Sequence, residues 1–309
     1  MKRDFISIAE YTADEIQELF NITRDLKKKT FEGVMHHICK GKTMAMIFAK
    51  PSARTRISFE TGMYQLGGYA LYLAPTDIGL GTRESVKDIA RVISRYNDII
   101  MARLFDHEHI LELANFASVP VINGLTDYNH PCQIMADIFT VWEHRRSLND
   151  LKITYVGDGN NVANSWINLS AKIPMQLVIC SPSGYEPDSA TINYAKKQKL
   201  SDISIIQDPI QAVKNSDVVY TDVWASMGQE HESNQRRKVF KNYQVNSNLL
   251  KHAKPDAVVM HCLPAHRGDE ITDEVIDGLQ SIVIDQAENR MHVQKAIIVK
   301  LLSCSIHDG

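Results

Sequence analysis

Apolar runs of strand length alternate with helical patterns along almost the whole chain, and this alternation constrains the fold more than any other feature. A short, continuously apolar run is typical of a strand that is buried on both faces. Buried strands that alternate with helices predict parallel sheets covered by helices on both sides. We expect strands at 43–49, 69–73, 98–102, 119–122, 153–156, 177–180, 218–220, 258–260 and 282–284.

Two of the intervening helices have recognisable ends. The pattern Ala13–Lys29 follows Thr12 and includes Glu15, which together fit a capping box. A second helix is expected to start near Ser58 and to stop at the glycine pair that begins at Gly67. These signals support the alternation of strands and helices that the apolar runs predict.

The length of the chain indicates two domains. Its 309 residues are about twice the ~150 residues of an average domain. The polar stretch 145–150, between a helix and a strand, is the expected joint. We predict an α/β fold with two doubly wound parallel-sheet domains joined by interdomain helices. The expected ranges are 1–148 and 149–287, with a C-terminal helix, 288–309, that packs back on the first domain.

Charge and cysteine content exclude several classes of function. A formal net charge of -3 does not indicate a nucleic-acid partner or an anionic membrane surface. Five cysteines, with none at metal-ligand spacing, indicate a reduced protein rather than a disulfide scaffold or a zinc site. The apolar runs are far shorter than the ~20 residues that span a bilayer, and the N-terminus does not resemble a signal peptide. We expect a cytoplasmic protein; a mature organelle protein stays open as an alternative.

The segment after the first strand has the composition of an anion site. Ser52 and Thr55 offer hydroxyls there, and Arg54 and Arg56 offer guanidinium groups suited to phosphate. A following helix adds free backbone N–H groups and a favourable dipole. The alternative is that Ser52 caps the helix and the arginines pair with acidic neighbours.

Two further strand ends favour the binding interpretation. Arg103 follows the strand 98–102, and His130 and Gln133 lie after the strand 119–122. A single arginine is usually a surface charge, and a single histidine is more often structural than catalytic. Polar groups at three successive strand ends are harder to explain in this way, because ligands of such folds bind at the carboxyl edge of the sheet.

Three strand ends in the second half also carry polar residues. Gly157-Asp158-Gly159-Asn160-Asn161 lacks the full G-x-G-x-x-G pattern, and the next strand does not end in an acidic residue, so a nicotinamide cofactor is a poor alternative. Asp222 follows the strand 218–220. His261 and Cys262 follow the strand 258–260 and suggest a Cys/His protease, but adjacent residues of an extended segment point to opposite sides.

Ser-x-Arg-Thr-Arg followed by His-Pro-x-Gln resembles the carbamoyl phosphate site of the aspartate and ornithine carbamoyltransferases. The resemblance implies that the first motif binds the phosphate, whereas Arg103, His130, Gln133 and Arg290 hold the carbamoyl group. The Cys and Leu of His-Cys-Leu-Pro would accept hydrogen bonds from the carbamoyl nitrogen through their backbone carbonyls. The implied carbamoyl phosphate-binding residues are Ser52, Ala53, Arg54, Thr55, Arg103, His130, Gln133, Cys262, Leu263 and Arg290.

Asp-x-x-x-Ser-Met-Gly, which begins at Asp222, is similar to the loop that closes over ornithine in the ornithine-using members. The resemblance implies that ornithine is bound by Asn161, Asp222, Ser226 and Met227. It implies the transfer of a carbamoyl group to the side-chain amine of ornithine, without a metal or an organic cofactor. The implied catalytic residues are Arg54, Arg103, His130, Asp222, Cys262 and Arg290. Putrescine as the acceptor, and a regulatory paralogue without activity, stay open.

Two departures from the family pattern affect the phosphate site. Ala53 stands where many members have Thr. Gly79 stands where members usually have Gln or His, which reaches the carbamoyl phosphate of a neighbouring subunit in a homotrimer or an assembly of trimers. Losing a hydrogen bond to a charged ligand is worth about 1.5–3 kcal/mol, unless Thr82 or Arg83 replaces it. The short chain favours arginine biosynthesis over citrulline breakdown.

Overall fold

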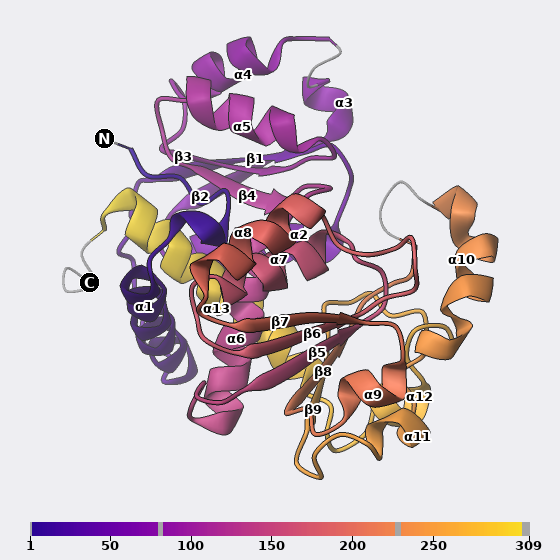
Figure 1. Cartoon of the computed structure of the whole chain (residues 1–309). Coiled ribbons are helices and arrows are strands. Elements are labelled where there is room, and N and C mark those ends of the chain that lie inside the picture. Colours follow the sequence, from indigo (N-terminus) through magenta and orange to yellow (C-terminus); the bar gives the residue numbers. More distant parts are fainter. Residues whose placement is uncertain (1, 80–82, 226–229, 305–309) are drawn as a thin grey trace. The chain divides into compact units, whose positions relative to one another are not determined.

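The computed structural model describes residues 2–79, 83–225 and 230–304. They form two compact units, each built around one parallel sheet (Figure 1). The first unit combines Met1–Ala136 with Asn289–Gly309, and the second is Asp137–Glu288. The predicted α/β fold with two parallel-sheet domains is confirmed. The predicted ranges 1–148, 149–287 and 288–309, which assign a substrate to each domain, stay a prediction.

The first unit contains a four-stranded sheet in the order β2-β1-β3-β4, and every neighbouring pair is parallel. Helices α4 and α5 pack on one face of this sheet, against side chains such as Ala45, Ile47 and Ile100. Helices α1 and α13 lie side by side on the other face (Figure 1), where Lys27 Nζ donates to Asn289 Oδ1 at 2.7 Å. The elements are η1 (Ile8–Glu10), α1 (Ala13–Phe31), β1 (Thr43–Phe48), α2 (Ala53–Gln65), β2 (Tyr69–Leu73), α3 (Pro75–Ile78), α4 (Val86–Ile93), β3 (Ile99–Arg103), α5 (His107–Phe116) and β4 (Val121–Leu125).

The second unit contains a five-stranded parallel sheet in the order β7-β6-β5-β8-β9. Val156 and Val219 face a cluster that includes Phe240 and Val275 from the helices after β6. The elements are β5 (Lys152–Val156), α7 (Asn161–Ser170), β6 (Gln176–Cys180), α8 (Ser189–Gln198), β7 (Asp202–Ile206), α9 (Pro209–Val213), β8 (Val218–Thr221), η2 (Glu230–Glu232), α10 (Ser233–Phe240), η3 (Lys241–Tyr243), α11 (Ser247–Leu250), β9 (Val258–His261) and α12 (Asp273–Ile276).

Two helices contribute residues to both units. These helices are α6 (Pro131–Arg145) and α13 (Val283–Leu302). The capping box at the start of α1 is present as predicted, with Thr12 and Glu15 as its two members. Among the helices of the described residues, none combines the length and the apolar character needed to cross a bilayer.

Two predicted elements differ from the structure, and one strand was not predicted. The run 282–284 is not a strand, because Val283 begins α13; three apolar residues fit either element, and length alone cannot decide between them. The edge strand β7 (Asp202–Ile206) was not predicted, because its alternating polar residues interrupt the apolar run. Helix α2 starts at Ala53 rather than near Ser58, so the residues predicted as a phosphate loop form its first turn.

Candidate active site

The topology of each sheet places its switch point next to residues that the sequence singled out. In the first sheet, β2 and β3 lie on opposite sides of β1, so the strand order reverses between β1 and β3. In the second sheet β5 is flanked in the same way by β6 and β8. Ligands of open α/β sheets bind at the carboxyl ends of the strands that flank such a point. The residues after β1 and β3, and those after β5 and β8, are therefore the candidate site residues.

In the first unit, polar side chains converge on the hydroxyl of Thr55. Thr55 is fully buried in the first turn of α2. Arg103 Nη1, at the end of β3, donates to Thr55 Oγ1 at 3.3 Å. Arg290 Nη2, from α13, donates to the same oxygen at 2.7 Å. Two guanidinium groups therefore meet at the amino end of a helix, which is a favourable place for an anion.

Ser52 is the N-cap of α2. Its backbone is extended, with φ -153°, and its Oγ accepts from the Thr55 backbone N–H at 3.4 Å and donates to Thr55 Oγ1 at 3.1 Å. The capping interpretation and the anion-site interpretation are thus compatible, because the cap holds the first-turn N–H groups and Thr55 in place. Ala53 and Arg54 occupy the next two positions and are exposed.

Arg56 does not belong to this cluster. Its Nε donates to Glu60 Oε1 at 3.0 Å, and its guanidinium lies 4.1 Å from the centre of the Tyr72 ring. For this arginine the alternative weighed from the sequence, pairing with an acidic neighbour, is the correct one. Of the two arginines in the motif, Arg54 is the remaining candidate phosphate ligand.

His130 and Gln133 lie at the start of α6 and are buried. Burial, together with the charges of Arg290 and Arg103, holds the pKa of His130 well below its usual range. His130 is therefore a neutral imidazole at physiological pH, which can donate a hydrogen bond without adding charge. Asn129, just before it, is fixed by Asn123, whose Nδ2 donates to Asn129 Oδ1 at 2.5 Å.

Gly79 ends the short helix α3 in the left-handed conformation, with φ 53° and ψ 44°. Its N–H donates to the Pro75 carbonyl at 3.1 Å, and its own carbonyl accepts from Arg83 N–H at 2.8 Å. A residue with a side chain is strained in this conformation, which explains why glycine suits the position. Thr82, considered as a substitute donor, lies outside the described residues.

In the second unit, Asp222 is the centre of a hydrogen-bonded cluster. It is buried just after β8. Asn160 Nδ2 donates to Asp222 Oδ2 at 2.8 Å, and the Cys262 thiol donates to Asp222 Oδ1 at 2.9 Å. Asn160 also caps α7, since its Oδ1 accepts from Val162 N–H at 2.9 Å. Asn161 is the first residue of that helix.

His261 does not activate Cys262. Its Nδ1 accepts from Leu263 N–H at 2.8 Å, and its Nε2 lies 3.0 Å from Glu270 Oε1. Both ring nitrogens are therefore engaged in holding the turn, in which Leu263 has a positive φ of 57°. The Cys/His protease interpretation is wrong. Ligand atoms of Asp222, His261 and Cys262 lie within 4.8 Å of one another, but metal binding would require His261 to give up one of these hydrogen bonds.

Asn160, Asp158 and Arg236 are site neighbours that the sequence analysis did not assign. Arg236 Nη1 lies 3.0 Å from Asp158 Oδ2 and also donates to the Trp224 carbonyl at 2.9 Å. Burial raises the pKa of Asp158 to about 6, against the opposing effect of Arg236. Asn160 could have been identified from the sequence, because an asparagine between Gly-Asp-Gly and a helical segment is a typical helix N-cap. Arg236 is distant in sequence from Asp158 and had no such signal.

Ser226 and Met227, predicted to bind ornithine, lie outside the described residues. Among the described residues of this cluster, Trp224 is the closest to them in the sequence. Its backbone carbonyl accepts a hydrogen bond from Arg236. The rest of the predicted ornithine site, Asn161 and Asp222, is described above.

The glycine-rich turn does not have the geometry of a dinucleotide site. A Cβ atom on Gly159 would lie 2.3 Å from the Pro187 backbone nitrogen and 2.4 Å from the Glu186 carbonyl carbon. In the dinucleotide fold the second glycine leaves this space for the pyrophosphate. Here the space is filled by the chain itself, which explains the glycine and disfavours a nicotinamide cofactor.

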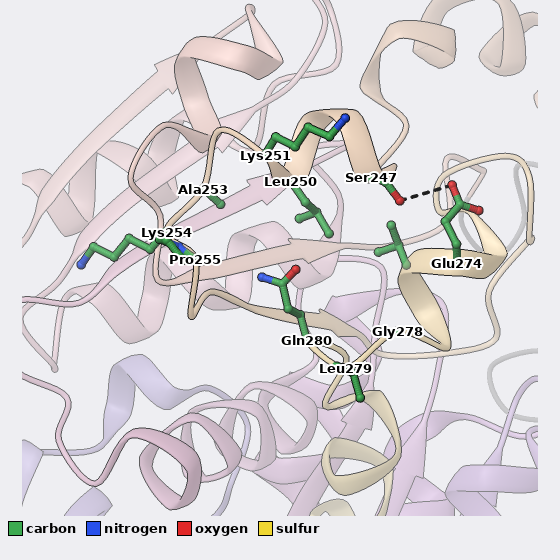
Figure 2. Close-up of a pocket in the computed structure, with 11 residues that line it drawn as sticks. Ser247, Leu250, Lys251, Ala253, Lys254, Pro255, Glu274, Gly278, Leu279 and Gln280 are labelled. Carbon is green, nitrogen blue, oxygen red and sulfur yellow. Dashed lines mark hydrogen bonds between the residues drawn. The ribbon is translucent and has the colours of Figure 1, made fainter.

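A pocket of about 480 Å³ lies elsewhere in the second unit. Figure 2 shows Lys251, Lys254, Leu279 and other residues around it, from α11, α12 and the segments that follow them. None of the predicted site residues lines this pocket. It is therefore not the candidate active site.

Two family models match the chain, and together they cover most of it. The carbamoyl-P binding domain of the aspartate/ornithine carbamoyltransferases matches residues 3–143, and the Asp/Orn binding domain matches residues 149–301. The chain belongs to this family. The resemblance predicted from the two motifs is confirmed.

Ornithine carbamoyltransferases of other organisms are similar to the chain over nearly their full length. An ornithine carbamoyltransferase of Syntrophus aciditrophicus is 55% identical over 98% of this chain and 100% of the relative. An anabolic ornithine carbamoyltransferase of Pyrococcus furiosus is 50% identical over 97% and 96%.

Solved structures of the family have the same fold. The structure of the Pyrococcus furiosus ornithine carbamoyltransferase matches with a TM-score of 0.93 at 50% identity, covering 96% of each chain. An anabolic ornithine carbamoyltransferase of Campylobacter jejuni matches with a TM-score of 0.92 at 37% identity, covering 97% of this chain and 99% of that one.

Proposed function

We propose that the chain transfers the carbamoyl group of carbamoyl phosphate to the side-chain amine of L-ornithine, giving L-citrulline and phosphate, in arginine biosynthesis. Relatives that bear the name of this reaction support it at identities of 50% and above, and one of them is named as anabolic. The observation that carries the proposal is the pair of polar clusters at the two switch points, one cationic around Thr55 and one acidic around Asp222.

Carbamoyl phosphate is the ligand of the first cluster, in the domain 1–148. The phosphate binds the amino end of α2 through Ser52, Ala53, Arg54 and Thr55. Arg103, His130, Gln133 and Arg290 bind the carbamoyl group. The convergence of Arg103 and Arg290 on Thr55 supports this assignment, because a hydroxyl that accepts from two cations lies in a strongly positive field.

Ornithine is the ligand of the second cluster, in the domain 149–287. Asp222 is the partner of the α-ammonium group, and Asn161, Ser226 and Met227 hold the amino-acid end. Cys262 lies next to the attacking amine, and the backbone carbonyls of Cys262 and Leu263 accept from the carbamoyl nitrogen. A buried carboxylate held by Asn160 and Cys262 is well suited to an ammonium group.

The chemistry requires a neutral amine and a stabilised oxyanion. The side-chain amine of ornithine has an ordinary pKa of about 10.4, and cationic groups around carbamoyl phosphate disfavour its ammonium form. Attack on the carbonyl carbon forms a C–N bond and places negative charge on the oxygen. Arg103, neutral His130 and Thr55 stabilise that charge. The C–O bond to phosphate then breaks, and the phosphate takes up the proton.

A homotrimer, alone or in an assembly of trimers, is the proposed form of the enzyme. Exposed apolar side chains on α2 and the edge strand β2 support it. Ile57 is 61% exposed, Tyr64 75% and Tyr69 66%. Exposed apolar groups that gather on neighbouring elements are typical of protein interfaces. We also propose a cytoplasmic location, which the five cysteines support because none of them is in a disulfide.

Phosphate release tests the proposal. Carbamoyl phosphate is supplied with ornithine, putrescine, N-acetylornithine or aspartate in parallel, and phosphate and the carbamoylated product are measured. We expect turnover with ornithine and release of one phosphate for each citrulline. Turnover with putrescine instead would overturn the ornithine assignment. Binding of carbamoyl phosphate with no amine-dependent release would support a regulatory paralogue.

A further inference from the structure

Two cysteines that the proposed reaction does not use lie in contact within the first unit. Cys39 is in the turn that precedes β1, and Cys304 lies two residues after the last residue of α13, Leu302. Their Sγ atoms are 3.4 Å apart, and the Cys39 thiol donates to the Cys304 sulfur. Both thiols are free. They are 265 residues apart in the sequence, so sequence spacing gave no indication that they meet.

Backbone hydrogen bonds fix both members of the pair. Cys39 N–H donates to the Leu66 carbonyl at 2.7 Å, and the Cys39 carbonyl accepts from Lys42 N–H at 3.0 Å. Cys304 N–H donates to the Val299 carbonyl at 3.1 Å, in the last turn of α13. The two sulfur atoms are therefore held together by ordered backbone on each side.

The environment separates the two thiols into different chemical roles. Cys39 is 1% exposed, whereas Cys304 is partly exposed and can meet a dissolved oxidant. The hydrogen bond from Cys39, followed by the charge of Lys42, lowers the pKa of Cys304 to about 7 against the effects of burial and of the Asp98 charge. The same hydrogen bond and burial raise the pKa of Cys39. Lys42 in turn is paired with Asp98 at 2.8 Å. A partly exposed thiolate beside a protonated thiol is the arrangement of peroxide-sensitive pairs.

We propose that Cys39 and Cys304 form a reversible disulfide when the protein meets a hydroperoxide, with Cys304 as the attacking thiol and Cys39 as the resolving thiol. The Cys304 thiolate attacks the hydroperoxide, an S–O bond forms, and the O–O bond breaks. The departing oxygen is protonated and leaves as water from hydrogen peroxide, or as the alcohol from an organic hydroperoxide. The Cys39 sulfur then attacks the resulting sulfenic acid. The S–S bond forms, the S–O bond breaks, and water leaves with the Cys39 proton. The two sulfur atoms are oxidised and the peroxide is reduced.

The other described cysteines are poorer targets. Cys132 and Cys180 are fully buried, and burial raises the pKa of each to about 12. Cys262 is partly exposed, but its thiol donates to Asp222 at 2.9 Å. The Cys262 thiol is thus bonded to a carboxylate, whereas the Cys304 sulfur accepts from the Cys39 thiol, which is the partner that can resolve a sulfenic acid. Peroxide is therefore directed to Cys304.

The disulfide joins the end of α13 to the turn before β1. Helix α13 also carries Arg290, and the chain continues after β1 into α2, whose Thr55 accepts a hydrogen bond from Arg290 at 2.7 Å. A cross-link between distant residues restricts the unfolded chain. We expect the oxidised protein to have a Tm higher on the order of 5–10 °C.

The test treats the full-length reduced protein with hydrogen peroxide, alkylates the remaining thiols, and maps cross-linked peptides by mass spectrometry. We expect a Cys39–Cys304 peptide that dithiothreitol removes, and a higher Tm before that reduction. A protein in which Cys39 is still alkylated after Cys304 has been oxidised would overturn the proposal. So would the oxidation of Cys262 before Cys304, or a lower Tm of the cross-linked form.

Single variants separate the two roles. In Cys39→Ser, Cys304 should still react, and its sulfenic acid should be trapped by dimedone because the resolving thiol is missing. In Cys304→Ser, Cys39 should stay reduced. Cys180→Ser is the control and should form the cross-link as the original protein does. Dimedone labelling of the original protein equal to that of Cys39→Ser would contradict the role of Cys39.

Discussion

Thr55 connects three segments that are far apart in the sequence. Its hydroxyl oxygen accepts from Arg103, at the end of β3, and from Arg290, which is 235 residues away on α13. Ser52, at the cap of α2, donates to the same oxygen. A small hydroxyl thereby sets the position of two guanidinium groups around the proposed carbamoyl phosphate site.

Thr55→Val keeps the shape of the side chain and removes the hydroxyl. Hydrogen bonds to charged groups are worth about 1.5–3 kcal/mol each, so we expect kcat/KM for carbamoyl phosphate to fall about 10- to 100-fold. Thr55→Ser should retain most of the activity. Thr23→Val is the control, since Thr23 is also fully buried and donates to the Leu19 carbonyl at 2.7 Å. Equal kinetics in Thr55→Val and Thr23→Val would contradict the role of Thr55.

Asn160 positions Asp222 and caps α7 at the same time. Asn160→Ala should cost about 1 kcal/mol of unfolding free energy through the lost cap. It should also raise KM for ornithine about 10-fold, because Asp222 loses its amide donor. Asn246→Ala provides the matched control, since Asn246 caps α11 through two backbone N–H groups. Steady-state kinetics and urea unfolding of both variants check this: an unchanged KM in Asn160→Ala would show that the residue is a cap alone.

The buried carboxyl of Asp158 makes stability depend on pH. Its pKa is raised to about 6, above the ordinary value of about 3.9. Between these values the folded state binds more protons than the unfolded state, so stability falls as pH rises and is constant above about 6. Relative to Asp158→Asn, the protein should gain up to about 3 kcal/mol of unfolding free energy between pH 7 and pH 4. Urea unfolding at several pH values measures the difference, and a constant difference would refute the expectation.

Residue types in the site were predictable from motifs, but their contacts were not. Ser52, Thr55, Arg103 and His130 follow strands that the apolar runs identified. Arg236, however, stands in a polar helix, and its ion pair with Asp158 depends on tertiary packing. The same is true of Arg56, because nothing in the motif distinguishes the arginine that pairs with Glu60 from the one that does not.

At the scale of elements, the ends of two helices carry residues that the proposal assigns to carbamoyl phosphate. The first turn of α2 supplies the N–H groups that Ser52 caps. Helix α3 ends at Gly79 in the left-handed conformation. The first feature follows from general rules of helix capping. The second explains a departure from the family pattern: with Gln or His at this position, the helix end would be strained.

Replacing Gly79 tests this explanation. Gly79→Gln should lower the unfolding free energy by about 1–2 kcal/mol because of its positive φ. In the proposed trimer it should also lower KM for carbamoyl phosphate about 10-fold by restoring a hydrogen bond to a charged ligand. Gly33→Gln is the control, because Gly33 also has a positive φ, 68°, and a Cβ there meets no atom within 4 Å.

The two variants should therefore share the loss of stability and differ in KM. An unchanged KM in Gly79→Gln would show that its side chain does not reach the ligand. An unchanged stability would contradict the strain argument.

The strands were predictable where they are continuously apolar, and the two errors have different causes. Three apolar residues fit a strand or a helix, so the run 282–284 was assigned to a strand although α13 begins at Val283. The edge strand β7 has an alternating pattern, which a search for buried runs does not detect. Longer elements, such as α1 with its capping box, were identified correctly.

At the scale of the whole molecule, the sequence predicted two α/β domains, and the structure has two units with parallel sheets. It also predicted that a C-terminal helix, 288–309, packs back on the first domain, but it did not predict the hydrogen bond of Arg290 to Thr55 within the first unit. Such contacts exist because the chain returns to the first unit after the last strand of the second sheet. They bring a residue from near the C-terminus to the proposed carbamoyl phosphate site.

The most direct test of the proposed reaction follows the carbamoyl carbon. Carbamoyl phosphate labelled with ¹³C at its carbonyl is incubated with the protein and ornithine, and the products are identified by NMR and mass spectrometry. We predict that the label appears in the ureido carbon of citrulline, attached to the side-chain nitrogen, with an equal amount of phosphate. Label on the α-nitrogen, or label released as cyanate or bicarbonate at a rate independent of ornithine, would contradict the account.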